Sequence, residues 1–295
     1  MKPTASFVLS RNCNFPRNEV NPVDKLKISQ LLRENFPAPF GFCSTEAAQP
    51  YLNCRALSRI PQDARSVIVL TFPYYTGEHP QRNISRYAMI PDYHLVAGEY
   101  LKKLCALLKE AFPQQQFEAF VDNSPLREVA CGQAAGLGVI GDNGLLIHPT
   151  YGSYLFLGEI VTDLFIEPDV PVGERCLHCG ACRKACPQGA LQENGSVELS
   201  LCRSHITQKK GELSDFEKEQ IRAGGLIWGC DICNDVCPMN RNPQLTPIPE
   251  FLDSVLPVMD EPLILEHFDS RPYNYRGRKT ILRNYSLLND QNFCD

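Results

Sequence analysis

The chain has 295 residues and a formal net charge of −5 at pH 7. This charge argues against a surface that coats nucleic acid broadly, but it leaves local basic contacts open. The length allows two domains, and a hydrophobic fraction of 43% is enough for a packed core. The amino terminus lacks the apolar segment of a secretory signal, and no apolar run is long enough to span a bilayer. We therefore expect a cytoplasmic protein without a membrane segment.

The first part of the chain mixes predicted helices and strands. Residues 1–24 are polar, and we expect an N-terminal extension there. From Asp24, apolar residues at helical spacing predict a helix that Pro37 ends. Helical spacing recurs over residues 95–112. Short apolar runs predict buried strands over residues 67–72, 117–121 and 154–161.

A proline-rich connector at residues 167–171 precedes the first cysteine run and marks a domain boundary. Beyond it, helices are predicted over residues 214–223 and 279–288. We expect an α+β chain with the following segments: an extension over 1–24, an α/β domain over 25–168, a double-cluster ferredoxin-like domain over 169–242, and a short helical tail over 243–295.

The cysteines of the second half form two runs with short spacing. Residues 176–187 read CLHCGACRKACP, which is the C-x2-C-x2-C-x3-C-P spacing of a bacterial two-cluster ferredoxin. Residues 230–238 read CDICNDVCP. Two [4Fe–4S] clusters take about eight thiolates, four for each cluster, and the two runs leave one position open. Cys202, which lies between the runs, is the candidate for this ligand.

By analogy with the ferredoxin crossover, the last cysteine of each run ligates the cluster of the other run. One cluster is then predicted to bind Cys176, Cys179, Cys182 and Cys237. The other is predicted to bind Cys186, Cys202, Cys230 and Cys233.

Zinc binding and disulfide formation fit these cysteines less well than iron–sulfur clusters do. Zinc also takes four cysteines, but zinc sites usually pair two C-x2-C knuckles, whereas three thiolates here come from one turn. A disulfide framework suits a short secreted chain rather than one of this length. The remaining cysteines carry no predicted chemistry: Cys13, Cys43, Cys54, Cys105, Cys131 and Cys294.

Residues 136–141 read GLGVIG and match the G-x-G-x-x-G pattern of dinucleotide-binding folds. That pattern requires a strand before it and a helix that opens at its glycines. Here the preceding residues 126–135 predict a helix, and residues 142–144 predict a turn into the apolar residues 145–147. We therefore expect a turn with close backbone approach rather than a nicotinamide site.

Asp122 follows the predicted strand 117–121 and begins the sequence Asp-Asn-Ser-Pro. Capping of the next helix is one interpretation, although Ser124, directly before Pro125, suits the N-cap position better. The other interpretation is catalytic, because a carboxyl beside an apolar wall can have a raised pKa and act as a general acid. The residues alone leave both open.

Several stretches together resemble the epoxyqueuosine reductase family. They are FVDNSP at 120–125, AGLGVIGDN at 135–143, PTYGSYLFLGE at 149–159, FIEPDVP at 165–171, CRSHIT at 202–207 and WGCDICNDVCP at 228–238. The resemblance implies two [4Fe–4S] clusters that pass electrons to a cobalamin. It implies reduction of the epoxide of epoxyqueuosine in tRNA to queuosine. It also implies an electron donor such as a flavodoxin or a ferredoxin.

The resemblance further implies roles for individual residues. Asp122 matches the proton donor of the family. Lys210 matches a position near the tRNA backbone, where a cation meets phosphate, although a solvated face is the alternative for an isolated basic run. The family positions that line cobalamin correspond to Ile147, Leu157 and Arg203.

Three departures from the family pattern concern the substrate. Val129 stands where the family commonly has Arg, and Asp142 stands where it commonly has Lys. The sequence ends at Asp295, where longer members continue into HEAT-like helical repeats. Two alternatives therefore stay open: a corrinoid iron–sulfur reductase of another small molecule, as in the related reductive dehalogenases, or an iron–sulfur electron-transfer protein without a substrate of its own.

Overall fold

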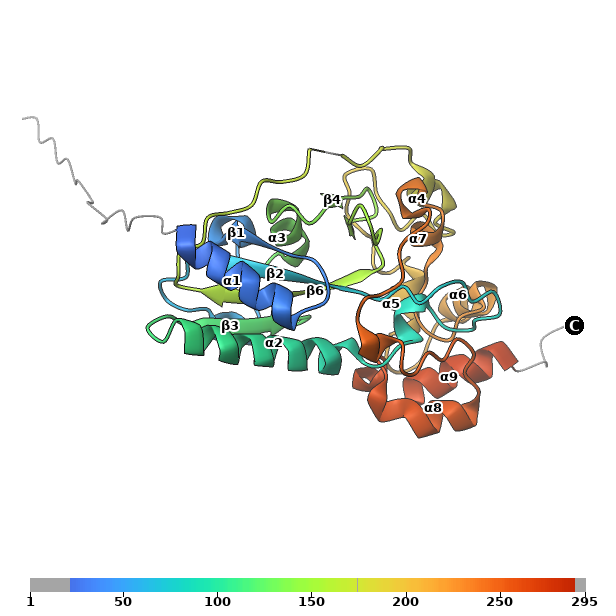
Figure 1. Ribbon diagram of the computed structural model, residues 1–295. Helices are drawn as coiled ribbons and strands as arrows, with labels where there is room; N and C mark the ends of the chain where they lie inside the picture. Colours follow the sequence, from blue (N-terminus) through green and yellow to red (C-terminus); the bar gives the residue numbers. More distant parts are fainter. Residues whose placement is uncertain (1–21, 174, 290–295) are drawn as a thin grey trace, which may run out of the picture.

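The computed structural model describes residues 22–173 and 175–289, which form two parts that lie side by side (Figure 1). One part holds the β-sheet with helices α1 to α3, and the other holds helices α4 to α9. Most of the expected N-terminal extension, residues 1–21, lies outside the described residues, as do Cys13 and Cys294. Within the described part of the chain, no helix is long and apolar enough to cross a membrane.

The main sheet has four strands in the order β1-β2-β6-β3, and all of its pairs are antiparallel. The strands are β1 (Phe40–Ser44), β2 (Ser66–Pro73), β3 (Phe117–Val121) and β6 (Leu155–Thr162). The three predicted strands correspond to β2, β3 and β6, whereas β1 was not predicted. Every residue of β2 is buried, because layers cover both faces of the sheet. This double burial explains why the strand reads as a continuous apolar run.

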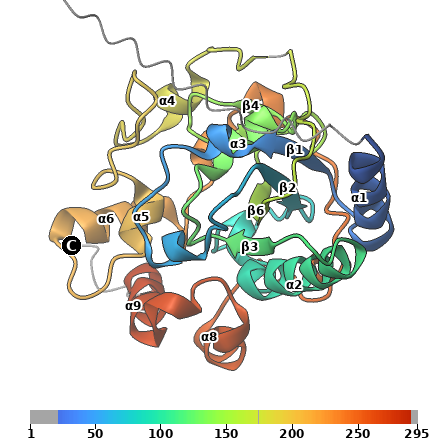
Figure 2. The same ribbon diagram turned by 90° about the vertical axis from the view of Figure 1, so that its left-hand side faces the viewer.

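Helices cover the two faces of the sheet (Figure 2). On one face lie α1 (Pro22–Asn35) and α2 (Tyr93–Ala111), which pack on Ile68 and its alternate neighbours in β2. On the other face lies α3 (Glu128–Ala134), which packs on Val67 and the odd-numbered residues. The predicted mixture of helices and strands is therefore confirmed. Helix α1 begins two residues before the predicted Asp24, inside the expected extension.

The glycine-rich residues 136–141 follow α3 and include the first strand of a small antiparallel hairpin. The hairpin consists of β4 (Val139–Ile140) and β5 (Leu146–Ile147). Gly136 has a φ of 72°, and a Cβ atom there would lie 2.7 Å from the carbonyl oxygen of Val170. The predicted turn with close backbone approach is thus confirmed, since the strand–turn–helix context of a dinucleotide site is not formed here.

The second part consists of short helices and loops. The helices are α4 (Ala181–Ala185), α5 (Arg203–Thr207), α6 (Asp215–Gly224), α7 (Ile232–Asp235), α8 (Glu261–His267) and α9 (Arg278–Asn289). Ser214 and Glu217 form a capping box at the start of α6, and Gly225 ends this helix in the left-handed conformation. The predicted polar helix over residues 214–223 is therefore confirmed.

The carboxyl-terminal helices pack on the loop between β2 and α2. Ile84 and Met89 of this loop are buried together with Trp228, Phe268 and Ile281. The segment expected as a tail therefore shares one apolar core with residues from both earlier segments. The limits of the predicted domains stay a prediction.

Candidate active site

Four predicted cluster ligands gather between α4 and α7. A small cavity of about 20 Å³ is lined by Cys176, Cys179, Cys182 and Cys237; we call it the cluster-1 cavity. Cys176 and Cys179 come from the turn that leads into α4, and Cys182 lies in the first turn of this helix. Gly180, at the N-cap of this helix, has a φ of 68°, a conformation that glycine adopts without strain.

The other four predicted ligands line a separate cavity of about 260 Å³, which we call the cluster-2 cavity: Cys186, Cys202, Cys230 and Cys233. Cys186 is the C-cap of α4, and Cys202 is the N-cap of α5. The backbone N–H of Ala190 donates a hydrogen bond to Sγ of Cys186 at 3.3 Å. Hydrogen bonds to ligand sulfurs tune the reduction potential of such clusters.

Helix α4 packs against helix α7. Because of this packing, Cys186 at the end of α4 reaches the cavity of the second run, and Cys237 after α7 reaches the cavity of the first. Each cavity is lined by four thiols, which is the donor set that a [4Fe–4S] cluster requires. The two predicted groups of cysteines are brought together in space, while their roles as ligands stay a prediction.

Helix α7 is fixed to the sheet part by buried charges that sequence reasoning missed. The carboxylate of Asp231, directly before α7, forms an ion pair with Arg82 and accepts a hydrogen bond from the backbone N–H of Arg86 at 2.9 Å. Asp235 in α7 forms ion pairs with the same two arginines, at 2.7 and 3.1 Å. Burial raises the pKa of Asp231, and the charge of Arg82 acts against this rise. The acidic residues inside the second cysteine run were the available signal.

Asp122 lies at the end of β3 and lines a third cavity of about 180 Å³. We call it the acid cavity; its lining residues are Tyr93, Asp122, Glu128, Val129, Leu145, Leu146, Ser153, Leu155, Phe156 and Leu157. Leu145 also lines the cluster-2 cavity, so the two cavities adjoin. The ring of Tyr93 stacks on Phe156 with centroids 3.7 Å apart, which fixes its hydroxyl beside the carboxylate.

Two side chains of α2 hold the Asp122 carboxylate. The Tyr93 hydroxyl donates a hydrogen bond to Oδ1 at 3.2 Å, and His94 Nε2 lies 3.3 Å from Oδ2. Burial alone would lower the pKa of His94, but hydrogen bonds to Asp122 and Asp92 outweigh it and raise this pKa to about 9. The hydrogen bond from His94 lowers the pKa of Asp122. The expected rise in the pKa of Asp122 is therefore wrong, because a cation, not an apolar wall, dominates its surroundings.

The capping prediction for Ser124 is also wrong. No helix begins at Pro125, since α3 begins at Glu128 with Arg127 as its N-cap. The Ser124 hydroxyl instead accepts a hydrogen bond from the backbone N–H of Leu126 at 3.1 Å, which closes a local turn. Asp122 therefore has no helix to cap.

The residues expected to line cobalamin lie at three different cavities. Leu157 lines the acid cavity, Arg203 the cluster-2 cavity and Ile147 the cluster-1 cavity. Arg203 is only 8% exposed, and its Nε has no hydrogen-bond partner among the described residues. Lys210, the predicted tRNA contact, is exposed on the surface after α5. These roles stay predictions.

The two family positions that are substituted in this chain, Val129 and Asp142, lie at different cavities. Val129 lines the acid cavity together with Asp122. Asp142 lines the cluster-1 cavity, and its Oδ1 lies 2.7 Å from Nδ1 of His178. Only the first departure therefore concerns the cavity that holds the candidate acid.

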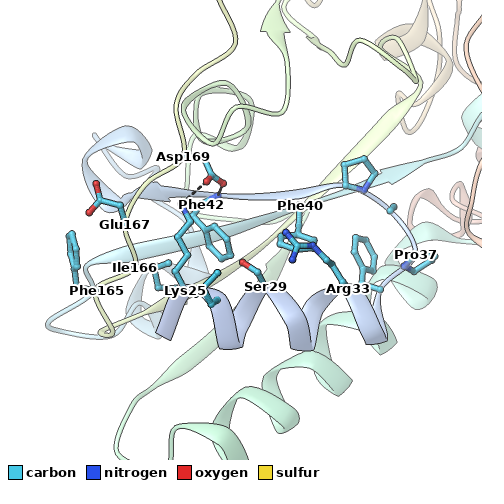
Figure 3. Close-up of a pocket in the computed structure, with 14 residues that line it drawn as sticks. Lys25, Ser29, Arg33, Pro37, Phe40, Phe42, Phe165, Ile166, Glu167 and Asp169 are labelled. Carbon is cyan, nitrogen blue, oxygen red and sulfur yellow. Dashed lines mark hydrogen bonds and ion pairs between the residues drawn. The ribbon is translucent and has the colours of Figure 1, made fainter. Parts of the chain in front are cut away.

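A larger cavity, about 910 Å³, lies elsewhere, between α1, β1 and residues 165–169 (Figure 3). Lys25 Nζ is ion-paired with Asp169 there at 2.6 Å, and the backbone N–H of Phe42 donates to the same carboxylate at 2.9 Å. None of the predicted site residues lines this cavity. Its size alone does not make it the candidate active site.

Comparisons with known proteins agree with this arrangement. The family model described as "4Fe-4S double cluster binding domain" matches residues 175–240, and the model "Epoxyqueuosine reductase QueG, DUF1730" matches residues 55–123. The chain therefore contains a double-cluster binding domain, and its limits enclose all eight predicted ligands.

Curated relatives are epoxyqueuosine reductases. The protein from Lactococcus garvieae is 34% identical over 77% of this chain and 70% of its own length. That from Bacillus subtilis is 35% identical over 90% of this chain and 72% of its own length. The match to the Listeria monocytogenes protein is 37% identical and covers 54% of that relative.

Solved structures of the same family share the fold. The epoxyqueuosine reductase from Streptococcus thermophilus is 28% identical, with a TM-score of 0.74 over 90% of this chain and 80% of that chain. An epoxyqueuosine reductase solved with an epoxyqueuosine-modified tRNA-Tyr stem loop is 27% identical, with a TM-score of 0.75 and the same coverage. With its two cysteine sets, its acid cavity and these relatives, the chain belongs to the epoxyqueuosine reductase family.

Proposed function

We propose that this protein reduces the epoxide of epoxyqueuosine in tRNA to the alkene of queuosine. The observation that carries the proposal is that the acid cavity, with Asp122, adjoins the cluster-2 cavity through the shared wall of Leu145. An acid and a candidate electron source thus lie on either side of one apolar residue. The solved relative with an epoxyqueuosine-modified tRNA stem loop supports the substrate class.

The reaction consumes two electrons and two protons. The epoxide loses its oxygen as water, and the two carbon atoms that held it become an alkene. The chain has a candidate source for the electrons and another for the protons. The cysteines that line the cluster-1 and cluster-2 cavities would hold the electron-carrying clusters, and the titratable side chains of the acid cavity would supply the protons. The electrons enter from a flavodoxin or a ferredoxin, for which the exposed Cys179 offers an approach to the cluster-1 cavity.

Cobalamin fits the residues present. The walls of the two adjoining cavities are mostly apolar or aromatic, as a flat corrin face requires, and the unpartnered Nε of Arg203 can donate to a corrin amide. We infer that Arg203 and Leu157 would hold it, whereas Ile147 lines the cluster-1 cavity. When bound, the clusters and the cobalamin supply the reducing electrons.

The protons come from this chain's own side chains. With its lowered pKa, Asp122 is ionised at neutral pH, whereas His94 is protonated. The pair therefore carries one proton, held on the imidazole and available through the carboxylate to the epoxide oxygen as negative charge develops there. The Tyr93 hydroxyl orients the carboxylate.

We infer that tRNA meets the protein through its phosphates, with Lys210 as one cation. The loss of arginine at Val129 removes a cation from the acid cavity itself.

The reliance on free thiols as metal ligands supports a reducing compartment such as the cytoplasm.

The test is turnover by the anaerobically reconstituted protein. The protein, loaded with clusters and cobalamin, is mixed with a reductant and an anticodon stem loop that contains epoxyqueuosine, and the nucleosides are analysed by mass spectrometry. We expect conversion to queuosine. Corrin binding without conversion would favour the small-molecule reductase instead. Two intact clusters without any corrin binding would favour the electron-transfer protein.

A further inference from the structure

Two buried carboxyl groups near Asp122 have no role in the mechanism above. Glu159, in the middle of β6, is fully buried, and neither of its carboxyl oxygens has a hydrogen-bond partner among the described residues. Oε1 of Glu128, at the start of α3, is also buried, and it has no hydrogen-bond partner among the residues that the structure describes. An ionised carboxylate without partners is very costly in such surroundings, so both groups are expected to hold a proton.

The fold directs both carboxyls to the same side of the sheet. Glu159 pairs with Phe120 of β3 and with Val69 of β2, and these two residues face α3. Helix α3 packs on β6, which brings Glu128 to the same layer. Glu128 also lines the acid cavity together with Asp122. The cavity volume of about 180 Å³ is room for several water molecules between the two side chains.

The electrostatic surroundings give Glu128 and Asp122 opposite protonation states. Burial, and next the charge of Asp122, raises the pKa of Glu128 to about 8. Burial raises the pKa of Glu159 well above its ordinary value, and the neighbouring titratable groups Glu128 and Cys131 add to this rise. At neutral pH, one wall of the cavity therefore carries a neutral acid, and another carries the ionised Asp122.

Other titratable groups face Glu128 from the neighbouring elements. Tyr93 of α2 and Cys131 of α3 both interact electrostatically with it, and both have pKa values raised above the ordinary range. Neither is charged at neutral pH. Among the described groups that act on Glu128, Asp122 is thus the charged one, and it favours the protonated form of Glu128.

We propose that Glu128 is the proton reservoir of the acid cavity and returns a proton to Asp122 after Asp122 has protonated the departing oxygen. This inference rests on the proposed function. An epoxide, two electrons from a one-electron donor protein and two protons yield an alkene and water. The His94–Asp122 pair supplies the first proton and Glu128 the second, and the His94 imidazole and the Glu128 carboxylate then each regain one proton from solvent.

The first test is the pH dependence of turnover. In the holoenzyme with a low-potential chemical reductant, we expect kcat to fall as the pH rises through about 8, where Glu128 loses its proton. Glu128→Gln should lower kcat at neutral pH about tenfold or more and leave KM for the stem loop unchanged. It should also abolish the fall near pH 8, so that only the fall near pH 9, where His94 loses its proton, remains. Glu128→Asp, which keeps a carboxyl group, should recover part of the rate.

The matched control is Glu99→Gln, on the exposed face of α2, where the side chain is 78% exposed. It should leave kcat and the pH profile unchanged. The proposal is overturned if Glu128→Gln keeps the wild-type kcat together with its alkaline fall.

The second test needs no turnover. Since the folded pKa of Glu128 is raised above the value of about 4.3 for an unfolded chain, the folded state holds an extra proton between these two values. The stability of the wild type should therefore fall as the pH rises through this window, and the stability of Glu128→Gln should fall less steeply. Melting temperatures of the two holoproteins measure the difference.

Equal slopes in the two proteins would show that Glu128 holds no such proton and would overturn the inference. A wild type that melts as expected but leaves epoxyqueuosine unreduced would instead count against the proposed function. The two failures are thus distinguishable.

Discussion

His94 Nε2 lies 3.3 Å from Oδ2 of Asp122, and Nδ1 of the same ring lies 2.7 Å from Oδ1 of Asp92. An imidazole between two carboxylates is favoured as a cation, since both contacts stabilise its charged form. The Asp92 carboxyl is buried and also accepts from the backbone N–H of His94, so the ring is held at the helix start. We therefore propose that the proton used in the reaction is held on the His94 imidazole rather than on the Asp122 carboxyl.

The first prediction concerns Asp122. Asp122→Asn keeps the shape of the side chain but cannot carry a proton between His94 and the substrate. We expect kcat to fall about 100-fold or more, with cluster and corrin absorption unchanged. Single-turnover assays on the stem loop measure the rate. Asp215→Asn, a change of a fully exposed carboxylate on α6, is the control and should be silent. Full turnover in Asp122→Asn would remove this residue from the mechanism.

The second prediction concerns the charge of His94. Its folded pKa of about 9 lies above the value of about 6.5 for an unfolded chain, so its contribution to stability is complete below the lower value. That contribution is lost as the pH rises through about 9. The melting temperature of His94→Gln should therefore decline less than that of the wild type over this window. An identical decline in both proteins would show that the ring is neutral.

The third prediction concerns the eighth cluster ligand. Cys202→Ala should remove about half of the bound iron and sulfide, and the electron paramagnetic resonance of the reduced protein should show one cluster. Cys105→Ala, in the apolar face of α2, is the matched control because that thiol is buried away from both cluster cavities. Retention of both clusters in Cys202→Ala would show that another group completes the second site.

The fourth prediction concerns the anchor of α7. Asp231→Asn removes the buried charge that Arg82 faces and should lower the free energy of unfolding by about 3 kcal/mol. The second cluster should also be lost faster on exposure to a chelator, since Cys230 and Cys233 flank this residue. Asp269→Asn, in an exposed ion pair with Arg278, should change the melting temperature little. An unchanged melting temperature in Asp231→Asn would contradict the anchoring role.

Local sequence determined much of this protein. The spacing of the two cysteine runs, together with the ferredoxin analogy and Cys202 from between the runs, predicted which thiols come together. This was possible because each run folds locally, with a turn and one short helix. The apolar periodicity predicted α1, α2 and three strands of the sheet, because the burial of one helix face, or of whole strands, leaves a direct trace in the order of residues. The flanking sequence also predicted that the glycines at 136–141 do not stand between a strand and a helix, as a dinucleotide-binding site requires.

Tertiary structure decided everything that depends on contacts between distant residues. β1 escaped prediction because the sequence Phe-Gly-Phe-Cys-Ser is short, and its pairing with β2 makes it a strand. The low pKa of Asp122 is set by His94, and the anchoring of α7 by Arg82, both far away in the chain. Burial and charge act through distances in space, and a sequence does not contain these distances. It could therefore name Asp122 as the candidate acid but not show that His94 contacts this carboxyl, nor that Glu128 lines the same cavity.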